Sequence, residues 1–487
     1  MAATILIVYL LALSVLFIFG LHGFSMVYHY TRLRPQDPDT APLPEDLPEV
    51  TVQLPLFNEL YVAERLVDSV CRLEYPKDRM QIQVLDDSTD ETTELLERVV
   101  AAKRADGFRI HLLHRSDRSG YKAGALREGL KSATGEYVAI FDADFLPEPD
   151  FLLHALPHLV SDPGLGLVQG RWEHLNHDYS LLTRIQAIAL DAHFAMEQQV
   201  RNRANYFMNF NGTAGVWRKS CIEDSGNWHA DTLTEDLDLS YRAQMRGWRF
   251  LYLNDLTCPA ELPSEINGLK SQQFRWTKGA IETAKKHLPS LWRSKQSLGV
   301  KLHGTAHLTS NIVFPCILLV AILNVPVLFL KKSRPDLAVL FDVMGIFILT
   351  SISTLLFYLF AQRDIRDDWQ RRMMIYPFFM AGTMGLAVNN TRAVFEALFN
   401  RKSAFERTPK YNILNSGDSW FSNRYRVSKV KTEVLLELLL ALYVLIGMVM
   451  SIYFVELSLI PFQMMFLVGF GLTGFLSLRH AFRRRIA

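Results

Sequence analysis

Residues 135–144 read GEYVAIFDAD, an apolar β-strand that runs directly into two acidic side chains. Upstream, the apolar segments Val50–Leu54 and Met80–Leu85 also have strand character, and a helical pattern at Glu59–Arg72 lies between them. This β-α-β alternation predicts a parallel sheet with a ligand crevice at the carboxyl ends of its strands. We therefore expect an α/β domain whose functional residues follow its strands.

Asp142 and Asp144 stand just after the predicted strand Tyr137–Phe141. Carboxylates at positions i and i+2 share one face and can converge on one hard cation. Magnesium and manganese prefer one or two carboxylates together with phosphate oxygens. The pair therefore predicts an Mg²⁺ or Mn²⁺ site that also holds a diphosphate, with a solvated acidic turn as the alternative interpretation.

Other polar residues follow the first two strands or begin the next helix. Asp86 and Asp87 could form an ordinary turn, or accept hydrogen bonds from the base or ribose of a nucleotide. Lys122, in the basic loop RSGYKAGAL at residues 118–126, is a candidate phosphate contact or a solvated residue at a helix N-terminus. The residues of this region that could contact a nucleotide or its phosphates are Pro55, Asn58, Glu59, Asp86 and Lys122.

The segment Thr234-Glu235-Asp236 opens a predicted helix that continues to about Arg246. Thr234 can serve as the N-cap, and acidic residues in the first turn are favoured by the helix dipole, so capping alone explains the motif. A helix N-terminus that faces the crevice would also hold an ionised Asp236 rigidly, as a general base must be held. Both interpretations remain open at this point.

A further motif, QQFRW at residues 272–276, lies on a helical segment that continues to about His287. Arg275 can form paired hydrogen bonds to diphosphate oxygens, and Trp276 can stack on the apolar face of a pyranose ring. The alternative is a surface arginine beside a tryptophan that anchors an amphipathic helix.

Taken in this order, these motifs resemble the processive, inverting family 2 glycosyltransferases of the cellulose synthase superfamily. The similarity is greatest to cellulose synthase-like enzymes that make mannan, glucomannan or β-glucan. It extends to VQGRW at 168–172, FNGTAG at 210–215 and FERTPK at 405–410, and so covers most of the chain from Val50 to Tyr411.

The resemblance implies a GT-A-like domain with a mixed, mostly parallel sheet, and it implies a role for each motif. Asp236 would be the catalytic base, with Glu235 and Thr234 beside it, and Asp142 and Asp144 would engage the metal and the diphosphate. The donor-binding set implied by the family is Pro55, Asn58, Glu59, Asp86, Lys122, Asp142, Gln272, Arg275, Thr408 and Lys410. The acceptor-binding set is Trp276, Gly212, Thr213 and Trp172.

The segment near 401–430 resembles the gating loop that closes over the nucleotide in cellulose synthases. Here Arg407 precedes Thr408, which departs from the usual Phe-x-Val-Thr pattern and makes an additional phosphate contact possible. Thr408 and Lys410 are the loop residues expected to contact the donor.

The chain has 487 residues, of which 49% are hydrophobic, and a net charge of only +2. This balance argues against a basic nucleic-acid-binding protein. Four distant cysteines without a C-x-x-C pair predict reduced thiols and no zinc site. Five apolar runs are long enough to cross a membrane, namely Thr4–Val27, Leu308–Leu330, Leu337–Phe360, Val434–Phe454 and Leu457–Leu478.

These runs predict a membrane helix at 1–31, a linker at 32–48, a cytosolic catalytic domain at 49–299 and a channel-forming membrane region at 300–487. Amphipathic helices at Tyr179–Arg201 and Ile266–His287 are expected to dock the domain on the bilayer. A sixth apolar stretch, Met373–Phe399, is too polar in its second half for an unpartnered span, and we expect it to lie along the interface or re-enter.

The predicted protein is thus a multi-pass enzyme of a bacterial inner membrane or its equivalent. It would add sugar from UDP-glucose or GDP-mannose, with inversion, to a growing β-linked glycan, and translocate the product. The linkage is expected to be β-1,4, and partner subunits are left open. One alternative is transfer of a single sugar to a ceramide- or polyprenyl-phosphate-type lipid, and another is a membrane transport or scaffold protein without activity.

Overall fold

The structure is a computed structural model that describes residues 2–33, 38, 42–403, 406–415, 417–420, 423–425 and 432–482. Parts of the predicted linker and of the predicted gating loop, including Phe405, lie outside the described residues. The C-terminal arginines at 483–485 also lie outside them.

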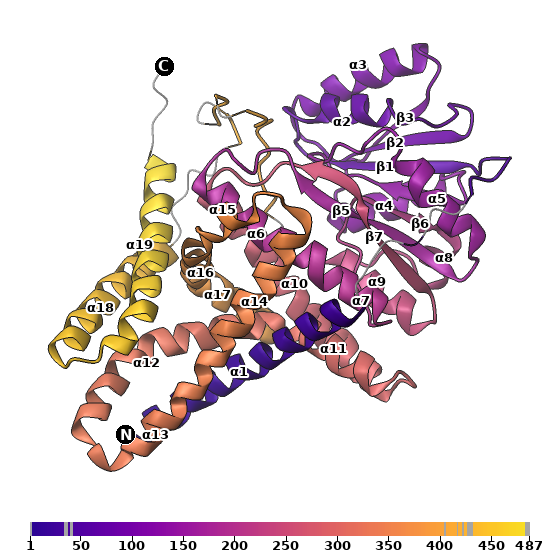
Figure 1. The fold of residues 1–487 in the computed structure, drawn as a ribbon. Helices are drawn as coiled ribbons and strands as arrows, with labels where there is room; N and C mark the ends of the chain where they lie inside the picture. Colours follow the sequence, from indigo (N-terminus) through magenta and orange to yellow (C-terminus); the bar gives the residue numbers. More distant parts are fainter. Residues whose placement is uncertain are drawn as a thin grey trace.

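A seven-stranded mixed sheet forms the centre of the domain (Figure 1). Its order is β3-β2-β1-β4-β6-β5-β7, and β6 runs antiparallel to both neighbours while the other pairs are parallel. The strands are β1 Val50–Leu56, β2 Met80–Asp86, β3 Arg109–His114, β4 Tyr137–Ile140, β5 Leu165–His174, β6 Gly215–Arg218 and β7 Arg249–Ala260. The predicted mixed, mostly parallel sheet is confirmed.

Helices cover both faces of this sheet, which explains why its central strands are buried along almost their whole length. One face packs against α2 Ala63–Val70, α3 Thr92–Ala105 and α5 Phe151–Ser161. The other packs against α4 Tyr121–Lys131, α8 Lys219–Asp224 and α9 Glu235–Met245. Buried amides on β1 and β2 satisfy one another, since Gln53 Nε2 donates to Gln83 Oε1 at 2.9 Å.

Two predicted helices have different bounds in the structure. The helix expected at Glu59–Arg72 is only Ala63–Val70, because the chain turns first at Asn58, which has a left-handed φ of 54°. The helix expected at Tyr179–Arg201 consists of α6 Leu181–Ala192, a π-helical turn at His193–Gln198 and α7 Gln199–Arg203. Ser180 fixes its start through a capping box with Thr183.

In the part of the chain that the structure describes, five helical segments are long and apolar enough to cross a membrane, and they coincide with the five predicted runs. They comprise α1 Ala2–Leu33, α11 Leu298–Thr309 with α12 Val313–Ser333, α13 Ala338–Val343 with α14 Ile348–Ile365, α18 Glu433–Tyr453 and α19 Ile460–Phe482. In Figure 1 they gather on one side of the molecule, away from the sheet.

The sixth apolar stretch forms two short helices, α16 Tyr376–Gly385 and α17 Ala387–Leu398, neither of which is long enough to cross. Gly385 of α16 lies against Gly469 of α19, so closely that a Cβ there would come within 2.4 Å of the Gly469 carbonyl oxygen. The polar residues of α17 face protein, because Asn389 is buried and donates to the Lys270 carbonyl at 3.0 Å. The helix α10 Ile266–Arg293 is thus a partner of α17, and it also pairs with Glu396 through Lys278 at 3.3 Å.

Three helical elements connect the sheet domain to the apolar helices. α6 packs against α14 and α16, and α10 packs against α17 and α19. The short α15 Trp369–Met373 follows α14 at the same boundary. Figure 1 shows α6 and α10 between the sheet and the apolar helices, where the predicted docking helices are expected.

Candidate active site

A pocket opens at the carboxyl ends of β1, β4 and β5, and the first turn of α9 and residues 407–410 complete its wall. It gathers most of the predicted site residues from widely separated segments. Those that line it are Pro55, Glu59, Lys122, Asp142, Asp144, Trp172, Gly212, Thr234, Glu235, Asp236, Gln272, Arg275, Trp276, Thr408 and Lys410.

The two acids after β4 each contact a lysine inside this pocket. Asp142 Oδ1 accepts from Lys122 Nζ at 2.5 Å, and Asp144 Oδ2 accepts from Lys410 Nζ at 2.5 Å. Asp144 is buried, and burial raises the pKa of Asp142 although Lys122 opposes that effect. The two acids therefore belong to an enclosed charged cluster, which excludes the interpretation as a solvated turn.

Thr213 supports this cluster from behind the pocket wall. Its Oγ1 accepts a hydrogen bond from the Asp142 backbone N–H at 2.9 Å, and its side chain is completely buried. Among the described residues Thr213 is not part of the pocket lining, and its hydrogen bond positions Asp142.

Lys122 is enclosed by acids, so the structure excludes the interpretation as a solvated residue. Its Nζ donates to the Gly212 carbonyl at 2.8 Å in addition to Asp142. Burial alone would lower the pKa of Lys122, but Asp142, Glu235 and Asp236 together raise it. The ammonium therefore stays charged at neutral pH in the centre of the pocket.

The N-terminus of α9 brings Asp236 into the pocket. Thr234 occupies the N-cap position, but among the described residues its side chain accepts no capping hydrogen bond. Instead, Thr234 Oγ1 lies 3.3 Å from Thr283 Oγ1 on α10. Thr234 therefore holds the N-cap position without a capping hydrogen bond from the described residues, and its hydroxyl group contacts α10 instead.

Burial raises the pKa of Asp236 to about 7, and the neighbouring Glu235 adds to the shift. Gly212 lies against this carboxylate with a φ of 85°, and a Cβ there would stand 3.0 Å from Asp236 Oδ2. A glycine is therefore required at this position by both conformation and space. A carboxylate that titrates near neutrality is suited to act as a general base.

Arg275 and Trp276 reach the pocket from α10. Arg275 Nη2 donates to Thr408 Oγ1 at 3.0 Å, and Arg275 also donates to the Glu406 carbonyl. Burial lowers the pKa of Arg275 to about 10, which leaves it protonated at neutral pH. Trp276 lies near Trp172, with 6.4 Å between the ring centroids. The helix therefore supplies a cation and an aromatic surface side by side.

The loop residues 406–410 dock into the pocket through charged contacts. Arg407 Nη1 lies 2.7 Å from Glu59 Oε2, and Lys410 Nζ also donates to the Glu261 carbonyl at 3.2 Å. Burial raises the pKa of Glu59 to about 7, although Arg407 opposes this. Arg407, the residue that departs from the usual loop pattern, thus adds a contact with the turn that follows β1.

Asp86 lies outside the pocket in the described part of the chain, while Asp87 lines it. The Asp86 carboxylate accepts from the Ser88 N–H at 3.0 Å and the Thr93 hydroxyl at 2.7 Å, and it contacts His114 Nδ1 at 2.8 Å. These bonds hold the turn after β2. Asp87 in turn accepts two hydrogen bonds from Arg115, at 2.7 and 2.5 Å.

Asn58 also has a positioning role beside the pocket. Its side chain accepts from the Thr89 N–H at 2.8 Å, and its own N–H donates to Ser88 Oγ at 2.8 Å. These bonds join the turns after β1 and β2. The pocket residues that the sequence did not single out include Phe57, Arg118, His174 and Asn211. Strand alternation could have found His174, because it stands two residues after Trp172.

Comparison with known proteins identifies relatives of the domain. Residues 48–279 match the family described as glycosyltransferase like family 2. Glucomannan 4-beta-mannosyltransferase 2 of Arabidopsis thaliana is 46% identical over 255 residues, which are 52% of this chain and 48% of that protein. Glucomannan 4-beta-mannosyltransferase 1 of Oryza sativa is 43% identical over 275 residues, 54% of this chain and 53% of that protein. The chain spans about half the length of these relatives.

A solved structure shares the fold. The mannosyltransferase PcManGT from Pyrobaculum calidifontis, in complex with GDP-Man and Mn²⁺, superimposes with a TM-score of 0.52 and 20% identity. The match covers 80% of this chain and 100% of that one, and at this identity it shows the fold alone. The predicted GT-A-like fold and the resemblance to cellulose synthase-like enzymes are thus confirmed. The match to glycosyltransferase like family 2 thus covers the described sheet domain of this chain, residues 48–279.

Proposed function

We propose that the chain is a membrane-embedded inverting glycosyltransferase that polymerises sugar from a nucleotide-sugar donor into a β-1,4-linked polysaccharide. The pocket itself carries the proposal. It combines two strand-end acids, a carboxylate that titrates near neutrality, an arginine and two tryptophans in one enclosed space. Those groups suit a leaving diphosphate, an acceptor hydroxyl and a pyranose ring.

The relatives indicate which donor to expect. Those named above are mannosyltransferases of glucomannan, and the solved fold neighbour holds GDP-Man. We therefore place GDP-mannose ahead of UDP-glucose as the donor. The polymer product follows from the same relatives, and the growing glycan would be the acceptor.

A divalent cation fits the residues that are present. Asp142 and Asp144 provide hard oxygen ligands in the same pocket, and the lysines that contact them here would turn to the diphosphate oxygens when a cation binds. Mg²⁺ or Mn²⁺ would be held by these two carboxylates and would neutralise charge on the departing diphosphate. Lys122 and Arg275 would bind the diphosphate oxygens.

The protein's own groups account for the remaining steps. Asp236 would take the proton of the acceptor hydroxyl, which then attacks the anomeric carbon on the face opposite the nucleotide. Trp276 and Trp172 would hold the acceptor ring, and Arg407 and Lys410 would draw the loop over the bound donor. A single displacement of this kind converts an α-linked donor into a β-linked product.

The orientation proposed for the membrane is five crossings with the catalytic domain in the cytosol. This orientation leaves Lys331, Lys332 and Arg334 outside, against the usual distribution of positive charge. Ion pairs offset these charges, because Glu456 contacts both lysines at 2.6 and 3.1 Å and Asp336 contacts Arg334 at 2.6 Å. Cysteine introduced at exposed Lys402 should react with an impermeant reagent from the cytosolic side only, and external labelling would contradict this orientation.

The test of function is incorporation of labelled sugar by the purified full chain in a lipid bilayer. GDP-mannose, GDP-glucose and UDP-glucose are supplied separately, and any product is digested with an endo-β-1,4-mannanase or a cellulase. We expect a mannanase-sensitive polymer from GDP-mannose. A product extracted with lipid that carries one sugar would favour the lipid-acceptor alternative, and no incorporation from any donor would contradict the proposal.

A further inference from the structure

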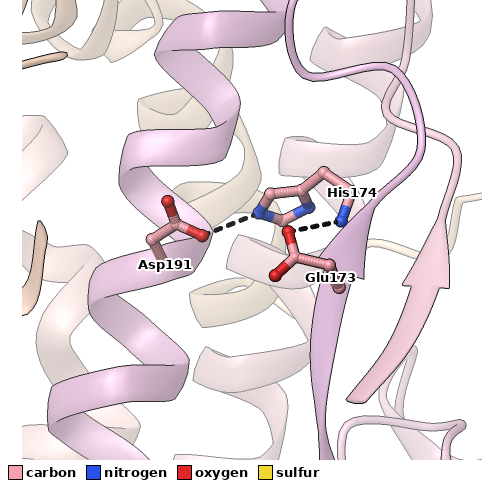
Figure 2. A group of neighbouring side chains, drawn as sticks. All are labelled: Glu173, His174 and Asp191. Carbon is pink, nitrogen blue, oxygen red and sulfur yellow. Dashed lines mark hydrogen bonds and ion pairs between the residues drawn. The ribbon is translucent and has the colours of Figure 1, made fainter. Parts of the chain in front are cut away.

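Three polar side chains, Glu173, His174 and Asp191, meet between the end of β5 and the helix α6 (Figure 2). His174 Nε2 lies 3.0 Å from Asp191 Oδ1, and the His174 backbone N–H donates to Glu173 Oε1 at 3.0 Å. Asp191 is on α6 and is almost completely buried, as is His174. The group has the composition of a metal site, and its other neighbours decide what it does.

Arg366, which follows the apolar helix α14, occupies the space between the two carboxylates. Its Nη2 lies 2.6 Å from Glu173 Oε1 and 2.7 Å from Asp191 Oδ1, and its Nε lies 3.1 Å from Asp191 Oδ2. Gln362 of α14 also donates to Asp191 Oδ2 at 3.0 Å. The arginine already supplies the positive charge that a divalent ion would bring, so these groups form a protein-internal network.

The network reaches the pocket through His174. Trp172 and His174 stand two residues apart on β5, so their side chains share one face of the strand, and both line the pocket. Trp172 in turn lies beside Trp276. His174 therefore continues the aromatic wall that we assign to the acceptor sugar.

Asp191 fixes which nitrogen of His174 carries a proton. Burial by itself would raise the pKa of Asp191, but hydrogen bonds from His174 and Arg366 hold it well below its usual range. An ionised carboxylate can only accept, so His174 Nε2 must donate to it. In the neutral ring, Nδ1 is then the nitrogen that can accept a hydrogen bond from a ligand hydroxyl.

We propose that His174 is an additional acceptor-binding residue, and that Asp191 and Arg366 are positioning residues that hold it from the membrane side of the domain. The imidazole would accept a hydrogen bond from a hydroxyl of the sugar that stacks on the tryptophans. This proposal rests on the proposed function. The network also links the end of α14 to the acceptor side of the pocket. Arg366 binds Glu173 and Asp191, the two carboxylates that contact His174.

The test separates acceptor binding from donor chemistry in the full chain embedded in a bilayer. The variants are His174→Ala, Asp191→Asn, Arg366→Gln and the conservative Arg366→Lys. Arg363→Gln is the matched control, because Arg363 lies on the same helix and is largely exposed. For each variant we measure the KM for a β-1,4-manno-oligosaccharide acceptor, the KM for the donor, the rate of donor hydrolysis without acceptor, and the melting temperature.

We expect the acceptor KM to rise about tenfold in His174→Ala and by a similar factor in Asp191→Asn and Arg366→Gln. Donor KM and donor hydrolysis should stay within about twofold, Arg366→Lys should recover most of the loss, and Arg363→Gln should behave like the original chain. The proposal would be overturned if the variants fold and their acceptor KM is unchanged. It would also be overturned if the KM for the acceptor and the KM for the donor rise equally.

Two readouts keep this outcome separate from failure of the proposed function. If the unaltered chain neither transfers nor hydrolyses any donor, the function itself is contradicted. Quenching of tryptophan fluorescence by the oligosaccharide, measured without donor, then still tests the acceptor site. Equal affinity of the original chain and His174→Ala in that titration contradicts the role of His174.

Discussion

Two parts of the chain meet in the pocket, and they differ in how they are held there. The strand-end part, with Asp142 after β4 and Glu59 after β1, is fixed by the sheet and its buried backbone hydrogen bonds. The loop part, residues 406–410, forms no regular element and is held by contacts between charged or polar side chains, such as Lys410 with Asp144. The sheet thus fixes acids at its strand ends, while the loop supplies cations that are held without any regular secondary structure.

The largest effect is expected from Asp236→Asn in the first turn of α9, which removes the base without changing its shape. We expect transfer to fall by about 10² to 10⁴-fold, the range typical of a lost general base, with donor binding retained. Steady-state transfer and nucleotide binding by calorimetry measure the two effects. Asp231→Asn, at an exposed residue outside the pocket, is the control, and near-normal turnover of Asp236→Asn would return this acid to a structural role.

Removal of divalent cations tests the pair of acids that the two lysines neutralise. Chelation should lower transfer by roughly 10² to 10³-fold, as when a preorganised charge-stabilising group is lost, and added Mn²⁺ or Mg²⁺ should restore it. Full activity after exhaustive chelation, with metal content checked by mass spectrometry, would contradict the metal assignment.

The pH dependence follows from the raised pKa of Asp236, which is about 7. The base must be deprotonated, so transfer should rise with pH through this value and level off above it. Between pH 8 and pH 6 the deprotonated fraction falls roughly tenfold for such a pKa, and kcat/KM, which reports the free enzyme, should follow. A kcat/KM that is flat over this range is inconsistent with Asp236 as the base.

A smaller effect is expected where the loop meets the sheet. Lys410→Gln removes the charge that contacts Asp144, and we expect donor KM to rise about fivefold, equivalent to roughly 1 kcal/mol for a lost charged hydrogen bond. Lys402→Gln, on the exposed part of the same segment, should leave donor KM unchanged. An equal effect from both variants would show that the loop acts through overall charge and would remove the specific role of Lys410.

The same contrast explains how far sequence reasoning reached. Asp142 and Asp144 were predictable because an apolar strand fixes where its end lies and which side chains share a face. The partners Lys122 and Lys410 were predicted as donor contacts, but their pairing with those acids depends on segments brought together only by folding. The local sequence pattern thus predicted which residues lie at the strand end, but not which distant residues contact them.

Two further differences between the sequence predictions and the structure have clear physical causes. The adjacent acids Asp86 and Asp87 look alike in sequence, yet Asp86 is used by the turn and Asp87 lines the pocket, because the chain turns between them. The polar residues of 387–398 argued against an unpartnered span, and the structure shows their partner to be α10. A partner distant in sequence cannot be recognised from local polarity alone.

The central claim is that this pocket transfers sugar with inversion, and the anomeric configuration of the first product tests it most directly. The purified full chain is given GDP-α-mannose with a short manno-oligosaccharide, and the one-bond carbon–hydrogen coupling of the newly linked anomeric centre is measured by NMR. The account predicts a β-linked residue whose formation is lost in Asp236→Asn. An α-linked product, or β-linked product that persists undiminished in that variant, would contradict it.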